Sequence, residues 1–253
     1  MLTKKDIMAF YDGYKAGECG KYSNVYEQQG RLAAILSLID LSTMTLVLDM
    51  GCGTGWLTRQ YANLTHGQAI GIDFSVESVN AAYSKAKEAG IYNVKFIAMD
   101  AEELQFGDDS FDCIICSEVI EHLLNPQKAL EEMARVVKPD GVVVITTPNP
   151  WNCNMVIGTI IREVRNTKGK WSAKGQIYDQ PLTPLKLNRM ILAAGMKIIK
   201  GKGSYYLPPL LNSRWKKLHN IFIRVSTFIE KKNLFSYFGL YQICLLYPVR
   251  KFK

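Results

Sequence analysis

A short apolar run is followed directly by three glycines at alternate positions, in the stretch Val47-Leu-Asp-Met-Gly-Cys-Gly-Thr-Gly-Trp56. A turn without Cβ atoms between a strand and a helix lets a ligand approach the backbone closely. Trp56 stands where a dinucleotide-binding turn would have its third glycine, and Asp49 places a carboxylate where a pyrophosphate would be repelled. The stretch therefore predicts a site for a cationic or amine-bearing ligand. The alternative is a tight turn with a structural role only.

Apolar runs of four to eight residues recur along the chain, with helical patterns between them. Such runs are typical of strands buried on both faces of a parallel sheet. The alternation predicts a doubly wound α/β sheet that binds ligands at the carboxyl ends of its strands. The predicted strands are 45–50, 68–74, 94–99, 111–117, 142–147, 196–200 and 241–249, and the clearest predicted helices are 76–89, 126–137 and 184–194.

We expect a single domain over residues 1–253, with an N-terminal helical cap over 1–40 and a cofactor-binding half over 41–149. Residues 150–253 would hold the last two strands and two insertions. The connection 150–182 is too long for an ordinary turn and predicts a lid after the fifth strand. Residues 207–238 are basic and aromatic, and predict a helical insert before the last strand.

The segment Val47–Thr58 resembles motif I of the class I S-adenosylmethionine-dependent methyltransferases. Four later segments follow in that family's order: Gly71-Ile-Asp-Phe-Ser75, Met99-Asp-Ala101, Ser117-Glu-Val-Ile-Glu-His-Leu123 and Arg135-Val-Val-Lys-Pro-Asp-Gly141. Each is a modest signal alone, whereas five in register are specific. The resemblance covers about residues 20–205. It implies a seven-stranded, mostly parallel, Rossmann-like sheet and S-adenosylmethionine as the cofactor.

The resemblance also implies which residues bind the cofactor. Asp73 would accept both ribose hydroxyls, and Asp100 would read the adenine edge; charge-assisted hydrogen bonds of this kind contribute about 1.5–3 kcal/mol each. The alternatives are a helix-capping acid at Asp73 and a solvated acid at Asp100. The predicted cofactor-binding residues are Asp49, Gly51, Cys52, Gly53, Gly55, Asp73, Phe74, Asp100, Ala101, Ser117 and Glu118.

The segment after the fourth predicted strand bears on the methyl acceptor. Cys116-Ser-Glu-Val119 replaces the Asn/Asp-Pro-Pro-Tyr/Phe of exocyclic-amine methyltransferases, and the chain has no Pro-Cys pair for C5-pyrimidine methylation. Glu118–Leu123 is similar instead to the quinone-biosynthesis O-methyltransferases and to enzymes of polysaccharide and lipid pathways, as is Thr146–Asn149. This implies O-methylation of a small-molecule, lipid, quinone or glycan acceptor. His122 would be the general base, and Glu121 is the second predicted catalytic residue; the alternative for His122 is a hydrogen-bonded wall of the cofactor pocket.

Some members of that group hold a divalent cation with two acids, a histidine and an aspartate three residues after the histidine. Here Asn125 takes the last position, so we predict no metal site. The alternative is a cation held by Glu118, Glu121 and His122. Cys113-Ile-Ile-Cys116 is not expected to bind metal, because positions three apart in a strand point to opposite faces.

Charge divides the chain into unlike halves. Residues 1–159 hold 12 Lys and Arg against 20 Asp and Glu, and residues 160–253 hold 19 against 3, so the two parts carry net charges of −8 and +16. The basic part suggests an anionic partner, and its alternative is a solvated basic face. The six scattered cysteines and the absence of an apolar N-terminal run indicate a cytoplasmic protein without disulfides.

A basic amphipathic pattern around Trp215–Lys232 predicts peripheral attachment to an acidic inner-membrane surface, or else a helix packed on the sheet. Nucleic acid is a less favoured partner. Two other functions stay open: an RNA methyltransferase that uses the basic half, and a cofactor-binding module without catalysis.

Overall fold

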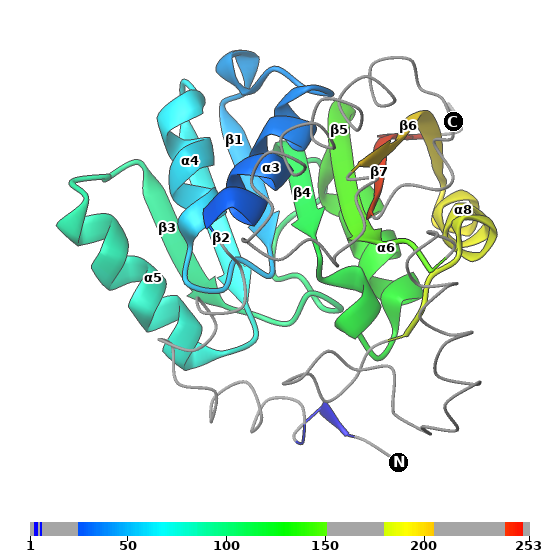
Figure 1. Ribbon diagram of the computed structural model, residues 1–253, viewed down its shortest axis with the longest axis horizontal. Coiled ribbons are helices and arrows are strands. Elements are labelled where there is room, and N and C mark those ends of the chain that lie inside the picture. The colour runs from blue at the N-terminus through cyan, green and yellow to red at the C-terminus, as the bar shows by residue number, and fades with distance from the viewer. Residues whose placement is uncertain (1–2, 5, 7–24, 151–179, 205–240, 250–253) are drawn as a thin grey trace, which may run out of the picture.

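A seven-stranded sheet forms the centre of the computed structural model, which describes residues 3–4, 6, 25–150, 180–204 and 241–249. The strand order is β3-β2-β1-β4-β5-β7-β6 (Figure 1). The strands are β1 (Leu46–Met50), β2 (Gln68–Asp73), β3 (Val94–Ala98), β4 (Phe111–Ser117), β5 (Val137–Pro148), β6 (Met196–Ser204) and β7 (Tyr241–Pro248). β1 to β5 pair in parallel, and β7 runs antiparallel to both β5 and β6. The predicted doubly wound, mostly parallel sheet is confirmed.

Helices cover both faces of this sheet (Figure 1). They are α3 (Val25–Leu36), α4 (Trp56–Leu64), α5 (Val76–Glu88), α6 (Pro126–Val136) and α8 (Pro184–Ala193), with the 3-10 helices η1 (Leu41–Thr43) and η2 (Ile120–His122). The core on one face contains side chains of α3 and α4, whereas the core on the other contains side chains of α6 and α8. α5 packs on β2 and β3.

Three helices begin where the sequence predicts, because a polar side chain caps each one. The side chains of Ser75, Asn125 and Thr183 each accept the backbone N–H three residues further on. Such caps satisfy donors that the first helical turn leaves free. A proline opens both α6 and α8, where its fixed φ angle suits the first helical position.

Two strands are longer than predicted. β5 begins at Val137, which pairs with Phe111, and its register on β4 then shifts before Cys113. Gly141 makes this close passage fit, since a Cβ there would lie 2.9 Å from the carbonyl oxygen of Phe111. β6 continues to Ser204 because β7 supplies an antiparallel partner along that whole length. An apolar-run criterion does not detect either extension.

Cys113 and Cys116 lie in the cores on opposite faces of the sheet, as predicted, and both thiols are free. The predicted lid and the basic insert fall almost wholly outside the described residues, as does much of the N-terminal cap. Among the helices that the structure describes, none is long and apolar enough to cross a membrane.

Candidate cofactor and active site

The glycine turn joins β1 to α4, and all three of its glycines have positive φ angles: 70° at Gly51, 51° at Gly53 and 73° at Gly55. Their surroundings differ. A Cβ on Gly51 would lie 2.3 Å from a Val119 methyl carbon, and one on Gly55 would lie 2.7 Å from the Phe96 ring. A Cβ on Gly53 would meet no atom within 4 Å. Packing therefore requires a residue without a Cβ at Gly51 and Gly55, whereas the space beside the Gly53 Cα is empty.

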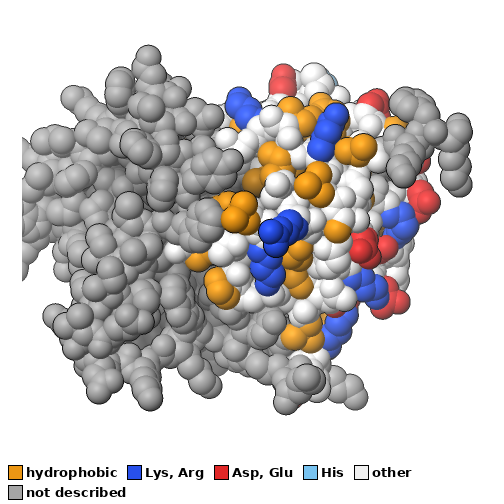
Figure 2. All heavy atoms as spheres, turned by 90° about the vertical axis from the view of Figure 1, so that its right-hand side faces the viewer, with side chains coloured by type: hydrophobic (Ala, Val, Ile, Leu, Met, Phe, Trp, Pro, Cys, Tyr) orange, Lys and Arg blue, Asp and Glu red, His pale blue; other side chains and the backbone are white. Residues whose placement is uncertain are grey.

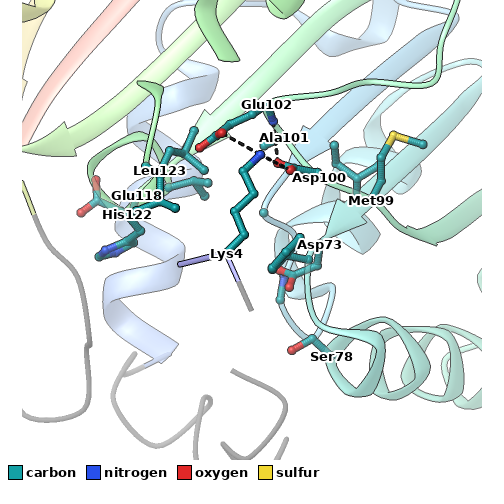
Figure 3. A pocket seen from close by; sticks show the side chains of 16 residues that line it. Lys4, Asp73, Ser78, Met99, Asp100, Ala101, Glu102, Glu118, His122 and Leu123 are labelled. Atoms are coloured by element: carbon teal, nitrogen blue, oxygen red, sulfur yellow. Dashed lines mark hydrogen bonds and ion pairs between the residues drawn. The ribbon is translucent and has the colours of Figure 1, made fainter. Parts of the chain in front are cut away.

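Gly53 opens onto a cavity of about 270 Å³ at the carboxyl ends of the parallel strands (Figure 3). Eight residues that the sequence placed in the site line it: Gly51, Gly53, Asp73, Phe74, Asp100, Ala101, Glu118 and His122. The other five predicted residues do not line it: Asp49, Cys52, Gly55, Ser117 and Glu121. The cavity is the volume that the fold leaves at the ends of β1, β2 and β4.

Asp73 ends β2 and is fixed by backbone donors. Its Oδ2 accepts the Gly53 N–H at 2.8 Å, and its Oδ1 accepts the Ser75 N–H at 2.9 Å. The first bond ties the carboxylate to the open glycine of the turn. A carboxylate oxygen has more than one acceptor position, so Asp73 can receive further donors from a ligand in the cavity.

Asp49 lies beneath the glycine turn and is 2% exposed. Burial raises the pKa of its carboxyl to about 7, against an opposing hydrogen bond from the Thr58 hydroxyl and with a further contribution from the charge of Asp73. Burial likewise raises the pKa of the Cys52 thiol well above its ordinary value. Asp49 is therefore a buried acid that joins β1 to α4 through Thr58, and Cys52 is not an activated thiolate.

At the opposite wall, Lys4 reaches into the cavity and pairs with two acids that follow β3 (Figure 3). Its Nζ lies 2.5 Å from Asp100 Oδ2 and 2.8 Å from Glu102 Oε2. Glu102 is buried, and its other oxygen accepts the Asn125 N–H at 2.8 Å. Sequence reasoning missed Lys4 and Glu102. Glu102 adjoins a recognised motif, but nothing in the sequence links Lys4 to a segment almost a hundred residues away.

Of the two acids that follow β4, Glu118 lines the cavity. Glu118 has a φ of 58°, and its Oε1 accepts the Thr146 hydroxyl at 2.9 Å. The Ser117 hydroxyl also hydrogen-bonds Thr146, at 2.9 Å. Burial and then the charge of Glu121 raise the pKa of Glu118 well above its ordinary value, and the charge of Arg31 opposes both. Positive φ at a non-glycine residue is a strained conformation often found in binding sites.

Glu121 and His122 lie side by side in η2. Glu121 is 2% exposed and accepts the Thr147 hydroxyl at 3.0 Å through Oε2. Its Oε1 lies 3.8 Å from His122 Nε2, close enough for an ion pair when the imidazole is protonated. His122 lines the cavity (Figure 3), so the site has an imidazole on its wall with a carboxylate next to it.

Arg31, in α3, is a second cation that sequence reasoning missed. Its charge acts on Glu118, and its buried Nε donor has no hydrogen-bond partner within the described part of the chain. A buried guanidinium N–H without a partner is costly, so this donor is suited to an anionic group of a ligand.

The fourth position of the metal pattern is used for structure. The Asn125 side chain accepts the Lys128 N–H at 3.2 Å and so caps α6. Within residues 25–150, 180–204 and 241–249 no three His, Cys, Asp or Glu side chains are grouped to hold a metal ion.

The methyltransferase-domain family matches residues 41–224, most of the chain and all of the glycine turn, Asp73, Asp100 and His122. The chain belongs to the S-adenosylmethionine-dependent methyltransferases. The cavity fits that cofactor: it has a carboxylate at the end of β2 and, beside it, a glycine backbone that no Cβ covers. The resemblance drawn from the five motifs is confirmed.

Relatives of this methyltransferase include the ubiquinone biosynthesis O-methyltransferase of Agrobacterium fabrum, 32% identical over 170 residues. The match covers 67% of this chain, which spans 65% of that enzyme's length. Two solved structures share the fold. The magnesium protoporphyrin IX methyltransferase from Synechocystis with bound SAH has a TM-score of 0.65 at 16% identity, covering 97% of this chain and 100% of that one. The [4+2]-cyclase SpnF has a TM-score of 0.63 at 21% identity, covering 90% and 85%.

Proposed function

We propose that this methyltransferase methylates a hydroxyl oxygen of a small-molecule acceptor, such as a quinone precursor or a related lipid or glycan. The observation that carries the proposal is the His122 imidazole on the cavity wall with the Glu121 carboxylate 3.8 Å from its Nε2. That arrangement suits proton removal from a hydroxyl, and the named function of the Agrobacterium relative supports the same reaction class.

The cofactor supplies an electrophilic methyl group on a sulfonium sulfur, whose carbon–sulfur electron pair stays on sulfur when the methyl leaves. His122 takes the hydroxyl proton as the acceptor oxygen forms its bond to the methyl carbon. Glu121 stabilises the imidazolium that results, since a carboxylate nearby favours the charged ring. The walls of the cavity hold the two reacting atoms in line, which is the main contribution a protein makes to such a displacement.

The cofactor would be held by Asp73 at its ribose and by Asp100 and Ala101 at its adenine. Gly53 allows close backbone approach, because no Cβ fills the space beside it. Arg31 would bind the carboxylate of the amino-acid portion through its unpaired Nε–H. Asp49 and Cys52 are buried and do not line the cavity, so this proposal gives them no direct contact with the cofactor.

Replacement of His122 by Ala tests the assignment. Turnover should fall by roughly 10²–10⁴, while cofactor affinity measured by calorimetry stays near that of the wild type. His66→Ala, a histidine outside the cavity, is the matched control and should leave both unchanged. Unchanged turnover in His122→Ala would show that His122 only lines the pocket and does not transfer a proton. Activity that a chelator abolishes and a divalent ion restores would instead support the alternative of a divalent cation held by Glu118, Glu121 and His122.

The acceptor class is tested separately, with methyl-labelled cofactor and quinone-lipid, glycan and RNA extracts. A second candidate, an RNA methyltransferase, is favoured by the basic back half: α8 and β6 carry Lys186, Arg189, Lys197, Lys200 and Lys202 and no acid. Figure 2 views this side and shows Lys and Arg side chains dispersed among apolar ones rather than gathered in a stripe. Label in RNA, with retention that falls steeply as salt rises, would favour this candidate. Cofactor binding without label in any extract would favour a non-catalytic module.

A further inference from the structure

Lys4 occupies the part of the cavity where the proposed function places the adenine of the cofactor. Its side chain extends between Asp73 and Met99 on one side and His122 and Leu123 on the other, and its ammonium ends at Asp100 (Figure 3). The contact is an ion pair of 2.5 Å with a carboxylate that is 23% exposed. A side chain in this position affects any ligand that uses Asp100.

The two oxygens of Asp100 already have protein donors. Oδ1 accepts the Glu102 backbone N–H at 2.8 Å, and Oδ2 accepts the Lys4 ammonium at 2.5 Å. The first bond is local, two residues along the chain, and fixes the carboxylate's orientation. A ligand that needs Asp100 as an acceptor must therefore share or displace Lys4 at Oδ2.

Two features hold Lys4 in this place. Glu102 pairs with the same ammonium at 2.8 Å, and its side chain is only 5% exposed, so loss of Lys4 would leave a buried carboxylate without its cation. Thr3 and Asp6 hydrogen-bond each other reciprocally, Thr3 N–H to Asp6 Oδ2 at 2.8 Å and Asp6 N–H to Thr3 Oγ1 at 3.3 Å. This is a capping box around the start of a helical turn at Lys4, and it orients the lysine toward the cavity.

We infer that Lys4 is an internal competitor of the cofactor: its ammonium takes the hydrogen-bonding position on Asp100 that the adenine amino group requires. This inference rests on the proposed assignment of Asp100 to the adenine. Cofactor binding breaks the contact between Lys4 and Asp100. The Lys4 ammonium keeps its second partner, Glu102, while Asp100 accepts a hydrogen bond from the ligand. The N-terminal segment thereby sets the affinity of the cofactor site.

The test compares Lys4→Met with the wild type by calorimetry, using S-adenosylhomocysteine, S-adenosylmethionine and adenosine as probes. Competition predicts that affinity for all three rises by about two- to fivefold, the range expected for removing a partly exposed ion pair. Lys128→Met is the matched control, because Lys128 pairs with exposed Glu103 at 4.0 Å and lies outside the cavity; its affinities should stay unchanged.

Stability provides a readout with the opposite sign. Lys4→Met should lower the melting temperature of the protein without ligand, because Glu102 loses its cation, while cofactor affinity rises. Thr3→Ala removes the capping hydroxyl, keeps the charge of Lys4, and should raise affinity by less. Lower or unchanged affinity in Lys4→Met would overturn the inference, as would a gain confined to S-adenosylmethionine, because only that probe is a sulfonium cation and the gain would then come from the change in local charge.

Failure of the inference and failure of the proposed function are distinguishable. If the wild type binds neither S-adenosylhomocysteine nor S-adenosylmethionine, the assignment of the cavity is wrong, and the inference is overturned with it. If the wild type binds both but Lys4→Met gains nothing, the competition is wrong and the proposed function stands.

Discussion

At the scale of single residues, the acids around the cavity differ in what surrounds each carboxylate. Asp73 accepts two backbone N–H groups, those of Gly53 and Ser75. Asp49 is buried with one hydroxyl donor, and its pKa rises to about 7. Glu118 is close to a second acid, and its pKa is also raised. Carboxylates at the site thus differ in burial and in hydrogen-bond donors, and we propose Asp73 as the one that accepts donors from a ligand.

Asp73→Ala should weaken cofactor binding by roughly ten- to a hundredfold, as loss of about 1.5–3 kcal/mol of charge-assisted hydrogen bonding requires. Isothermal calorimetry with S-adenosylhomocysteine measures the effect. Asp140→Ala, an exposed acid outside the cavity, is the control and should bind like the wild type. Near-normal affinity in Asp73→Ala would contradict the ribose assignment and leave Asp73 as a support for Gly53 and Ser75.

The residues that the sequence motifs identified lie in the last residues of β1, β2 and β4 or in the segments that follow β1, β2, β3 and β4. Each such segment is continuous in sequence, so a spacing pattern can find it. Lys4 and Arg31 were missed because they reach the site from N-terminal segments, and only the packing of α3 and the pairing of Lys4 with Asp100 bring them there. A pattern read from one sequence contains no information on such long-range contacts.

At the scale of elements, the glycine turn combines two requirements that look identical in sequence. At Gly51 there is no room for a Cβ, because Val119 packs against it. At Gly53 the missing Cβ leaves free space on the side that faces the cavity. The predicted strands β1 to β4 agree with the structure to within a residue at nearly every end, since buried runs of fixed length are visible in the sequence. The longer β5 and β6 depend on register with β4 and β7, which no local pattern specifies.

Paired substitutions separate the two requirements. Gly53→Ala should cost the fold about 1–2 kcal/mol, for a positive φ alone, yet weaken cofactor binding by more than that energy accounts for. Gly51→Ala should destabilise the protein more strongly, because its Cβ would overlap Val119. Urea denaturation and calorimetry on both variants give the comparison. Equal losses of stability, or wild-type affinity in Gly53→Ala, would argue against a ligand role for the open glycine.

At the scale of the whole molecule, Asp112 links three strands at the end of the sheet away from the site. Its Oδ2 accepts the N–H groups of Thr45 and Leu46 at 2.9 and 2.8 Å, and its Oδ1 pairs with Lys138 at 2.5 Å. Burial alone would raise the pKa of this carboxyl, but the bonds from Lys138, Thr45 and Leu46 outweigh it and lower the pKa to about 2. One acid thus joins the starts of β1, β4 and β5.

The lowered pKa of Asp112 makes part of the stability depend on pH. A depressed carboxyl pKa stabilises the fold above the unfolded value of about 4, and the contribution disappears as pH falls toward 2. We expect Asp112→Asn to lose about 2 kcal/mol of unfolding free energy at pH 7 and the gap to the wild type to close near pH 2. Urea denaturation at several pH values measures it. A gap that stays constant with pH would show that the charge of Asp112 is not responsible.

The charge division of the chain leads to a prediction for residues beyond those described. If the Trp215–Lys232 segment lies on an acidic membrane, co-sedimentation with liposomes should require anionic lipid and fall as salt rises. Lys216, Lys217 and Arg224 changed together to Glu should abolish it, whereas Lys197, Lys200 and Lys202 changed in the same way serve as the matched control. Wild-type protein that remains in the supernatant at low salt would favour a soluble anionic acceptor instead.

The position of β7 has a consequence for how this protein folds while it is synthesised on the ribosome. β7 follows every other strand in the chain, yet it lies between β5 and β6 and is the strand with which β6 pairs. During synthesis β1 to β5 can pair as they emerge, while β6 stays without its neighbour and β5 exposes an open edge. Unpaired edges are the surfaces that chaperones bind and that aggregate. A nascent chain stalled anywhere between residues 204 and 241 should therefore remain a client of the folding machinery, and a premature stop codon in that interval should yield an insoluble product rather than a weaker enzyme.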